Sequence, residues 1–314
     1  MLRGGTNIVP YISRERFLVK LFYLQTGRTA RPAFGPGAFV NHIADPDICR
    51  GALQLAANLV RKVSRPCFNH PSAVLRSARD EVARTLTGIP GLAVPKTIRV
   101  PASLAAVREA ITQSGLDYPI LARVAGTHAG KTLIKIGEPQ GLEEIGRLNA
   151  GTRSLYITEF RDFAYRNGGY RKFRVALVGD EILLRHCIIA DHWLLHAPSR
   201  ASNTGEEERA MFDAFDGPWS SHLHPLFREI GRRLGLDYFG VDCTIDAQGT
   251  VLLFEANACM SILLNTSPSP NIWDEPIARI NAAVEKRLAE PSTWYGPVPA
   301  EPVQGQADLT HCEH

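Results

Sequence analysis

One hairpin near the C-terminal end constrains the fold of this chain more than any other segment. Tyr238–Ile245 and Thr250–Asn257 are apolar runs separated by a short polar stretch with a glycine, which predicts two adjacent strands. A connection of two or four residues would place Asp242 beside or diagonal to Glu255 on one face of the sheet, whereas a connection of three would not. Asn257 shares the face of Glu255, because side chains two residues apart on a strand point the same way.

These three side chains offer only oxygen donors, namely two carboxylates and one amide. Such a hard donor set suits Mg²⁺ that is shared with phosphate oxygens, and Mn²⁺ is the alternative ion. The competing interpretation is that Asp242 and Glu255 are edge carboxylates facing water, with Asn257 at a turn. The strand spacing alone leaves both interpretations open.

A second feature is a glycine-containing loop between two predicted strands within Tyr118–Ile136. Such a loop can fold over phosphates with its backbone N–H groups pointing at oxygen, and Arg123 and Lys131 would supply positive charge. The segment is not a P-loop, because it lacks the G-x-x-x-x-G-K-[ST] motif and no helix follows. A polar hairpin loop without a ligand is the competing interpretation. The residues assigned here to phosphate binding are Arg123, Gly126, His128, Gly130 and Lys131.

A third feature is the apolar strand Leu155–Phe160, which is followed by Arg161 and Asp162. A strand that leaves one domain offers main-chain groups to a flat heterocycle, and the Asp162 carboxylate can accept hydrogen bonds from ribose hydroxyl groups. Any strand between two domains has this pattern, so the feature has low specificity by itself. It is consistent with one wall of a nucleotide site.

Length and composition narrow the class of protein. A chain of 314 residues predicts two or three compact units, and 45% apolar with 21% charged residues is typical of a globular protein with a core. The net charge, 35 − 32 = +3, predicts no general affinity for nucleic acid or membranes. No apolar run reaches the roughly 20 residues of a membrane span, and the N-terminus shows no secretion signal. The six cysteines form no C-x-x-C pair, so we expect reduced thiols and a cytoplasmic protein.

The order of the predicted elements divides the chain into units. Ala38–Ile43 and Pro66–Phe68 are short strands around a helix, with Asp45-Pro46 suited to its N-cap and first turn, which predicts a β-α-β unit. Hairpin strands with few helices follow and predict an α+β unit. Residues 171–196 then alternate as antiparallel strands, with a short strand at Trp193–His196. The expected units are residues 1–71, 72–160 and 161–290, followed by a disordered tail at 291–314.

Two polar clusters leave alternatives open. The histidines His186, His192 and His196 could converge on zinc, or His186 could face an active cleft, and an ordinary half-buried histidine is the competing interpretation. A basic run around Gly168-Gly169 is either a solvated loop or the binding site of an anionic partner. This run comprises Arg166, Arg171, Lys172 and Arg174.

Taken together and in this order, these features resemble the ATP-grasp superfamily. The resemblance covers about Phe68–Leu288, and its most specific part is D-x₁₂-E-x-N within GLDYFGVDCTIDAQGTVLLFEANA. FNHPSAVLRSARDEVARTLTGIPGLAVPKT is similar to the segment that enters the nucleotide-binding part of glutathione synthetase, RimK-type glutamate ligases and D-alanine–D-alanine ligase. The runs Tyr-Arg-Lys-Phe-Arg and His…His-Trp…His are similar to those of a RimK-like bacterial branch.

The resemblance implies an ATP-grasp fold, in which a small α+β lid subdomain closes over ATP against a larger antiparallel-sheet subdomain. A short N-terminal β-α-β unit would then help to bind substrate, and a partner subunit of a homo-oligomer could complete the site. The implied activity is ATP-dependent carboxylate–amine ligation through an acyl phosphate, with ADP as product and small-molecule carboxylate and amine substrates. The implied roles are Asp242, Glu255 and Asn257 as magnesium ligands, Glu159 and Phe160 at the adenine, and Arg174 together with Lys131 as catalytic cations.

The chain departs from the family pattern at three places. The family usually has lysine where this chain has Arg123, and arginine keeps the charge while adding a fork geometry for phosphate. Many relatives have Asp-Lys at Asp80-Glu81, and many have Asp-x-Arg at Lys172-Phe173-Arg174. ATP binding remains the expectation, with Lys172 on the cofactor-binding wall and serving the substrate of this branch. The alternatives are a nucleotide-binding regulatory or scaffold module without turnover and an ATP-dependent phosphotransferase.

Overall fold

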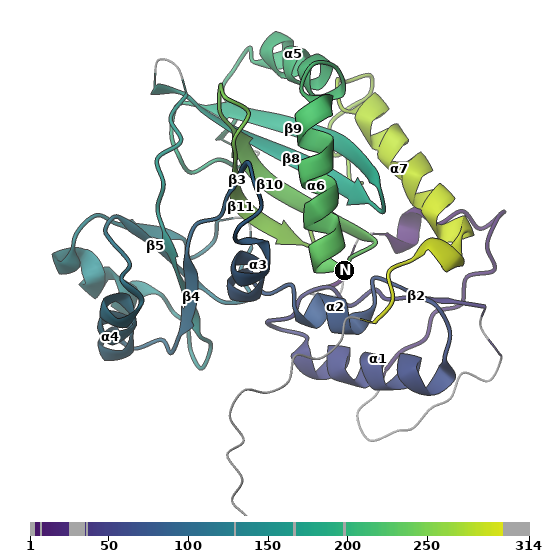
Figure 1. The fold of residues 1–314 in the computed structure, drawn as a ribbon, viewed down its shortest axis with the longest axis horizontal. Helices are drawn as coiled ribbons and strands as arrows, with labels where there is room; N and C mark the ends of the chain where they lie inside the picture. The colour runs from purple at the N-terminus through teal and green to yellow at the C-terminus, as the bar shows by residue number, and fades with distance from the viewer. Residues whose placement is uncertain are drawn as a thin grey trace, which may run out of the picture.

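The computed structural model describes residues 4–6, 8–24, 35, 37–128, 130–165, 168–196 and 199–297. Within these residues, the strands form a two-stranded, a four-stranded and a five-stranded sheet. Figure 1 shows the four-stranded sheet with α4 at one side of the molecule, and the five-stranded sheet with its helices above α1 and α2. The predicted architecture is confirmed: a small α+β unit accompanies a larger, mainly antiparallel sheet.

The N-terminal unit is a parallel pair of very short strands connected through a helix, as predicted. Helix α1 begins at Arg50, later than expected, and Asp45 is not its N-cap. The Asp45 side chain instead accepts hydrogen bonds from the backbone N–H groups of Asp47 and Ile48, at 2.8 and 3.2 Å, and so closes a separate turn before the helix. The elements are β1 (Phe39–Val40), α1 (Arg50–Val63), β2 (Cys67–Phe68) and α2 (Pro71–Leu75).

The four-stranded sheet has the order β4-β7-β5-β6 and is antiparallel throughout. Helix α4 packs on it through Val107 and Ile111. The Ser103 hydroxyl accepts a hydrogen bond from the N–H of Ala106 at the start of α4, and Gly115 ends the helix with φ +63°. The elements are β4 (Thr97–Val100), α4 (Leu104–Ser114), β5 (Ile120–Val124), β6 (Ile134–Ile136), the 3₁₀ helix η2 (Pro139–Arg147) and β7 (Leu155–Glu159).

The five-stranded sheet has the order β3-β11-β10-β8-β9, and only the β3–β11 pair is parallel. Helix α3 (Arg79–Leu86) contacts both β4 and β11 and thus bridges the two larger sheets. The elements of the sheet and its flanking helices are β3 (Leu92–Ala93), β8 (Tyr170–Val178), β9 (Glu181–Ala190), α5 (Gly205–Asp216), α6 (Ser220–Leu234), β10 (Tyr238–Ile245), β11 (Val251–Asn257) and α7 (Asp274–Ala289).

The alternation of side chains along β8 decides which of its residues can reach a ligand. Phe173 and Val175 belong to the core that α6 covers, whereas Ala176 and Val178 belong to the core that α7 covers. Lys172 and Arg174 therefore lie on the same face of the sheet as Ala176 and Val178, but they precede the stretch of β8 that α7 covers. The sequence predicts this shared face, and the structure places both side chains in one cavity.

Two features expected in the C-terminal half of the chain, a short strand and a disordered tail, differ in the structure. Trp193–His196 is not a strand but a series of bends after β9. The predicted disordered tail is ordered in its first residues: Pro291–Thr293 forms a 3₁₀ helix, and the Trp294 ring packs edge-on against Phe68, with centroids 5.3 Å apart. Partial burial of this indole against the N-terminal unit explains the order, while residues 298–314 lie outside the described chain. No helix among the described residues has the length and apolarity needed to cross a bilayer.

Candidate functional site

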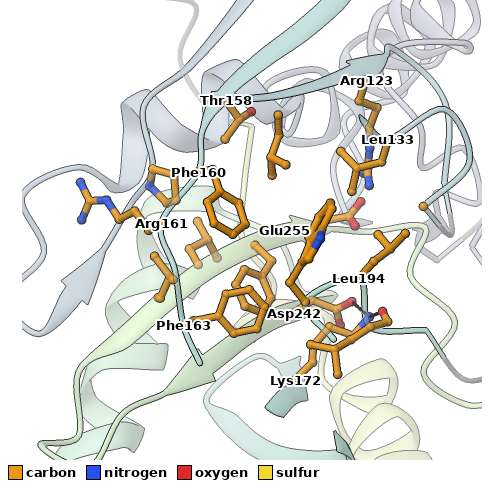
Figure 2. Close-up of a pocket in the computed structure, with 18 of the residues that line it drawn as sticks. Arg123, Leu133, Thr158, Phe160, Arg161, Phe163, Lys172, Leu194, Asp242 and Glu255 are labelled. Atoms are coloured by element: carbon orange, nitrogen blue, oxygen red, sulfur yellow. Dashed lines mark hydrogen bonds and ion pairs between the residues drawn. The ribbon is translucent and has the colours of Figure 1, made fainter. Parts of the chain in front are cut away.

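A cavity of about 470 Å³ lies between the four-stranded and the five-stranded sheet. Strands β5 and β7 line one side, and β8 to β11 line the other (Figure 2). Its charged side chains are Arg79, Arg123, Glu159, Arg161, Lys172, Arg174, Asp242 and Glu255. Five cations and three carboxylates leave a formal excess of 5 − 3 = +2. This excess favours an anionic ligand.

A β-bulge brings the two key carboxylates together. The connection between β10 and β11 is longer than expected, because Ile245 pairs with Val251 and five residues lie between them. With an unbroken ladder, Asp242 would then face Phe254. The register shifts between Asp242 and Cys243, however, so Phe254 is passed over and Asp242 pairs with Glu255. The juxtaposition of Asp242 and Glu255 is thus present, although neither predicted loop length produces it.

Asn257 joins this pair from the same face of β11, as predicted. Its Nδ2 group donates a hydrogen bond to Glu255 Oε1 at 2.5 Å, and its Oδ1 faces the Cys259 thiol at 3.3 Å. Both Asp242 and Asn257 are buried, and the Glu255 side chain is 18% exposed. The three oxygen-bearing groups are therefore held in one partly enclosed place.

Asp242 is held by two cations of β8. Arg174 donates two hydrogen bonds to its carboxylate, at 2.7 and 2.9 Å, and the Lys172 ammonium lies 3.4 Å from Oδ2. Burial alone would raise the pKa of Asp242, but Arg174 and Lys172 hold that pKa well below its ordinary value. Asp242 is consequently a carboxylate anion that can bind a cation or accept a hydrogen bond.

Glu255 is held by arginines from two other elements. Arg79 at the start of α3 forms an ion pair with it, and Arg123 of β5 lies close by. Burial would raise the pKa of Glu255, yet these two guanidinium groups lower it. Arg123 is itself buried, and burial together with Arg79 lowers its pKa to about 10. Its Nε has no hydrogen-bond partner among the described residues.

An unpartnered N–H on a buried guanidinium is costly unless a ligand satisfies it. Figure 2 shows Arg123 on the opposite side of the cavity from Asp242 and Lys172. An anion in the cavity would therefore meet cations from both sheets. The sequence assigns Arg123 and Lys172 to the nucleotide site but does not single out Arg79, whose only signal is its place beside Asp80-Glu81 at a helix start.

The other end of the cavity is aromatic and apolar. Phe160 and Trp193 meet edge to face with centroids 5.7 Å apart, and the Lys135 ammonium lies 3.5 Å from the Phe160 ring centroid. Glu159 also lines the cavity, but Arg161 binds its carboxylate at 2.8 Å. Asp162, assigned to ribose, is exposed and does not line the cavity. Trp193 is an aromatic lining residue that the sequence does not single out, because the histidines around it dominate this segment.

The glycine loop does not face the cavity as a whole. Gly130 lines the cavity, whereas Gly126, His128 and Lys131 do not, and Lys131 is exposed. The Gly126 N–H donates a hydrogen bond to the Asp47 carboxylate at 3.1 Å, so the loop contacts the N-terminal unit. The phosphate-binding roles of Gly126, His128 and Lys131 therefore remain predictions that depend on movement of this loop.

Gly130 occupies a position that only glycine fits. Its φ is +67°, and a Cβ at this residue would lie 2.0 Å from Nε2 of His196. His196 itself lines the cavity, and burial lowers its pKa. The loop is therefore in close contact with the segment after β9.

The three histidines of that region do not converge on a metal. His186 is partly buried beside Arg174 and lines the cavity, burial holds its pKa well below the ordinary value, and its Nε2 has no partner among the described residues. His192 is half exposed and contacts Asp191 at 2.9 Å. Among the described residues, the one group of three or more histidine, cysteine, aspartate or glutamate side chains whose donor atoms lie close enough to share an ion is Asp45, His128 and Cys259. The predicted zinc alternative is thus wrong for His186, His192 and His196.

The predicted basic run is divided between two faces of β8. Arg171 is buried on the face opposite Lys172 and Arg174, and it forms an ion pair with Glu207. Arg166 lies outside the described residues. Of the three members of this run that the structure describes, Lys172 and Arg174 line the cavity and Arg171 does not.

Comparison with known proteins gives similarity in structure only. No family model and no curated protein sequence matches the chain. Among solved structures, the chain is similar to a RimK domain protein, ATP-grasp, from Sphaerobacter thermophilus DSM 20745, with 16% identity, TM-score 0.49, and coverage of 83% of this chain and 84% of that one. It is also similar to the VanG D-Ala:D-Ser ligase from Enterococcus faecalis, with 16% identity, TM-score 0.49, and coverage of 77% and 70%. For the D-alanine-D-alanine ligase from Coxiella burnetii the values are 10%, 0.49, 83% and 72%.

Proposed function

We propose that the cavity binds ATP with Mg²⁺ and that the chain uses ATP to activate a carboxylate for amide formation. One observation carries the proposal: two paired carboxylates, an excess of arginine and lysine, and an aromatic end share one cavity. A nucleoside triphosphate with its cation has three matching parts, namely a bound divalent ion, a polyanion and a flat base. The resemblance to carboxylate–amine ligases selects the reaction among those that use ATP.

The phosphate groups would lie among Arg79, Arg123, Lys172 and Arg174. In this structure, Arg174 donates hydrogen bonds to Asp242, and Arg79 forms an ion pair with Glu255. With a divalent cation on the carboxylates, these guanidinium groups would instead be free to donate to phosphate oxygens, for which their fork geometry is well suited. Arg123 already has an unused N–H in this place.

The donor set fits Mg²⁺, which prefers oxygen and holds phosphates with one or two protein carboxylates. Asp242 and Glu255 would hold the ion. Asn257 now presents its Nδ2 to Glu255, so a half-turn of the amide would be needed to present its oxygen. When bound, Mg²⁺ offsets the negative charge that accumulates on ADP as the γ-phosphoryl group leaves.

The proposed reaction starts when a substrate carboxylate oxygen attacks the γ-phosphorus of ATP, and the bond to the bridging oxygen of ADP breaks. Arg123 and Arg174 would neutralise the phosphoryl oxygens in this transition state. An amine then attacks the acyl carbon and displaces phosphate, which gives the amide. Closure of the loop that holds Gly126, Gly130 and Lys131 would keep water from the acyl phosphate.

A second function is favoured by the ion pairs of the cavity. Arg174 and Arg79 neutralise the two carboxylates without any metal, so the cavity could hold an anion as a binding module that does not turn over. Such a module would bind nucleotide equally well with and without Mg²⁺. The ligase requires the ion.

Product analysis tests the proposed function. The full chain is incubated with ATP, Mg²⁺ and pools of carboxylates and amines, and ADP, phosphate and amide are quantified. We expect ADP release that needs Mg²⁺ and a carboxylate, with amide formed in equal amount when an amine is present. A phosphorylated product without amide would establish a phosphotransferase, and ATP left intact with every pool would contradict turnover.

Arg123→Ala is expected to weaken nucleotide binding, because it removes a buried phosphate donor. We expect at least a tenfold rise in Kd, a loss of about 1.4 kcal/mol or more, in calorimetric titration with ATP and Mg²⁺. Arg123→Lys should retain part of the affinity, since the charge remains. Arg108→Ala on the exposed face of α4 is the matched control and should bind like wild type. Equal affinities of Arg123→Ala and the control would remove Arg123 from the site.

A further inference from the structure

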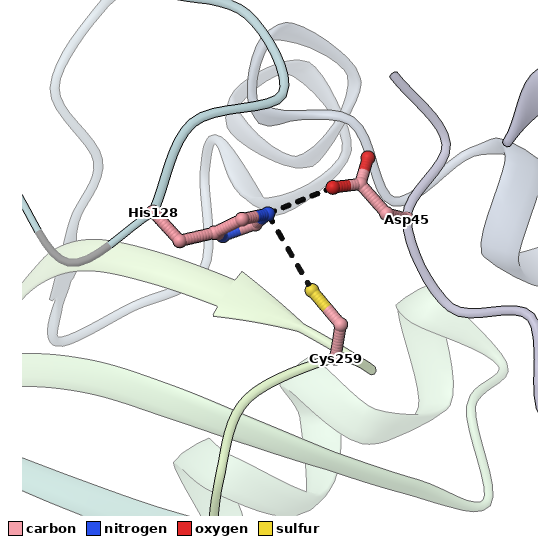
Figure 3. Close-up of side chains that lie close together, drawn as sticks. All are labelled: Asp45, His128 and Cys259. Atoms are coloured by element: carbon pink, nitrogen blue, oxygen red, sulfur yellow. Dashed lines mark hydrogen bonds and ion pairs between the residues drawn. The ribbon is translucent and has the colours of Figure 1, made fainter. Parts of the chain in front are cut away.

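Three chemically different donors meet outside the cavity, at Asp45, His128 and Cys259 (Figure 3). Asp45 precedes α1, His128 lies in the glycine loop, and Cys259 follows β11, so they come from distant parts of the chain. His128 Nε2 lies 2.7 Å from Asp45 Oδ2 and 3.9 Å from Cys259 Sγ. One donor atom of each residue lies within 4.8 Å of the other two.

This arrangement does not match a nucleophilic relay. In such a relay, one ring nitrogen of histidine faces the carboxylate and the other faces the nucleophile. Here the same nitrogen, Nε2, faces both Asp45 Oδ2 and Cys259 Sγ (Figure 3). Donors that converge on one point are the arrangement that a bound cation requires.

Hydrogen bonds orient two of the donors. Asp45 Oδ1 accepts from the backbone N–H groups of Asp47 and Ile48, which leaves Oδ2 for the cluster. The Asp45 side chain is 2% exposed, whereas that of His128 is 46% exposed and leaves an entry path. The other ring nitrogen of His128, Nδ1, lies 3.9 Å from Glu255 Oε1. A carboxylate near the second ring nitrogen often orients an imidazole that binds a metal.

We propose that Asp45, His128 and Cys259 bind a borderline-soft divalent cation of the Zn²⁺ class. A thiolate, an imidazole and a carboxylate form a ligand set typical of Zn²⁺, with a fourth position left for water or another ligand. Binding releases the proton of the Cys259 thiol and the proton that His128 shares with Asp45. The oxygen-only set Asp242, Glu255 and Asn257 favours Mg²⁺ instead, so the two sites take different ions.

Metal binding here has a structural consequence. The three ligands belong to the N-terminal unit, the glycine loop and the segment after β11, so one ion would tie the loop to both neighbours. Asp47 already contacts this loop through Gly126. The ion would therefore hold the loop in the position seen in this structure.

Metal content of the full chain tests the proposal without any measure of ATP turnover. The chelator-treated protein is titrated with Zn²⁺ in excess Mg²⁺, and with Co²⁺ as a spectroscopic probe. We expect one Zn²⁺ per chain and a thiolate-to-cobalt charge-transfer band. Cys259→Ser should lose the band, and Cys259→Ser and His128→Asn should each weaken Zn²⁺ binding by about 100-fold or more.

Two controls make the outcome specific. His192→Asn removes a histidine that lies 2.9 Å from the Asp191 carboxylate but does not belong to the cluster. This variant should retain Zn²⁺ binding. Cys67→Ser removes a buried thiol of β2 that does not belong to the cluster, and the folded variant should retain the band. Circular dichroism identifies any variant that fails to fold, and the half-exposed His128 keeps the test decisive if Cys259→Ser is unfolded. Wild type without stoichiometric Zn²⁺, or full binding by folded His128→Asn, would overturn the proposal.

Discussion

Glu255→Gln is expected to reduce carboxylate-dependent ADP release by a factor on the order of 10²–10³ or more, while the chain still folds. The substitution keeps the shape of the side chain but removes the charge that would hold Mg²⁺. It also leaves Arg79 and Arg123 without their carboxylate, so a lower melting temperature is expected. Steady-state assays of ADP release, with circular dichroism to establish folding, measure both effects.

Glu81→Gln is the matched control for this variant. Glu81 lies on α3, the helix of Arg79, and forms an exposed ion pair with Arg84. Its removal should leave the rate of ADP release unchanged. A folded Glu255→Gln variant with the wild-type rate would show that Glu255 holds no catalytic ion.

Arg174→Ala is expected to lower kcat by a factor on the order of 10² or more, with a smaller change in the KM for ATP. Arg174 donates two hydrogen bonds to Asp242, and its removal takes away both a phosphoryl contact and the group that orients this carboxylate. Lys172→Ala should mainly raise the KM of the carboxylate substrate. The Lys172 ammonium donates to the Leu195 carbonyl at 2.7 Å, at the edge of the same cavity.

Arg171→Ala separates the two faces of β8. Arg171 neighbours Lys172 but lies on the other face, where it pairs with Glu207 outside the cavity. It should change the melting temperature and leave kcat unchanged. Similar small losses in Arg174→Ala and Arg171→Ala would mean that this strand does not contact the transferring group.

The sequence predicts the hairpin and its carboxylates because both are local. Apolar runs of fixed period identify β10 and β11, and Asp242 and Glu255 stand out as charges within them. The bulge at Phe254 is not predictable in the same way, since a bulge depends on packing across the sheet. Two departures from the expected geometry, a longer turn and a bulge, compensate and restore the pairing.

Contacts between distant segments account for what the sequence does not reveal. The glycine loop has the composition of a phosphate-binding loop, but Asp45 and Asp47 of the N-terminal unit bind its imidazole and a backbone N–H. Arg79 enters the cavity only because α3 packs against β11. No local pattern contains these contacts, because they join residues that are tens to hundreds of positions apart in the chain.

Calorimetric titration of the full chain with a non-hydrolysable ATP analogue, with and without Mg²⁺, tests whether the cavity is a site for nucleotide and magnesium together. We expect one saturable site per chain whose affinity requires Mg²⁺ and is lost in folded Glu255→Gln. Saturable binding that is equal with and without Mg²⁺ would contradict the metal assignment and favour an anion-binding module. No saturable binding at millimolar analogue with Mg²⁺ would contradict the assignment of the cavity to nucleotide.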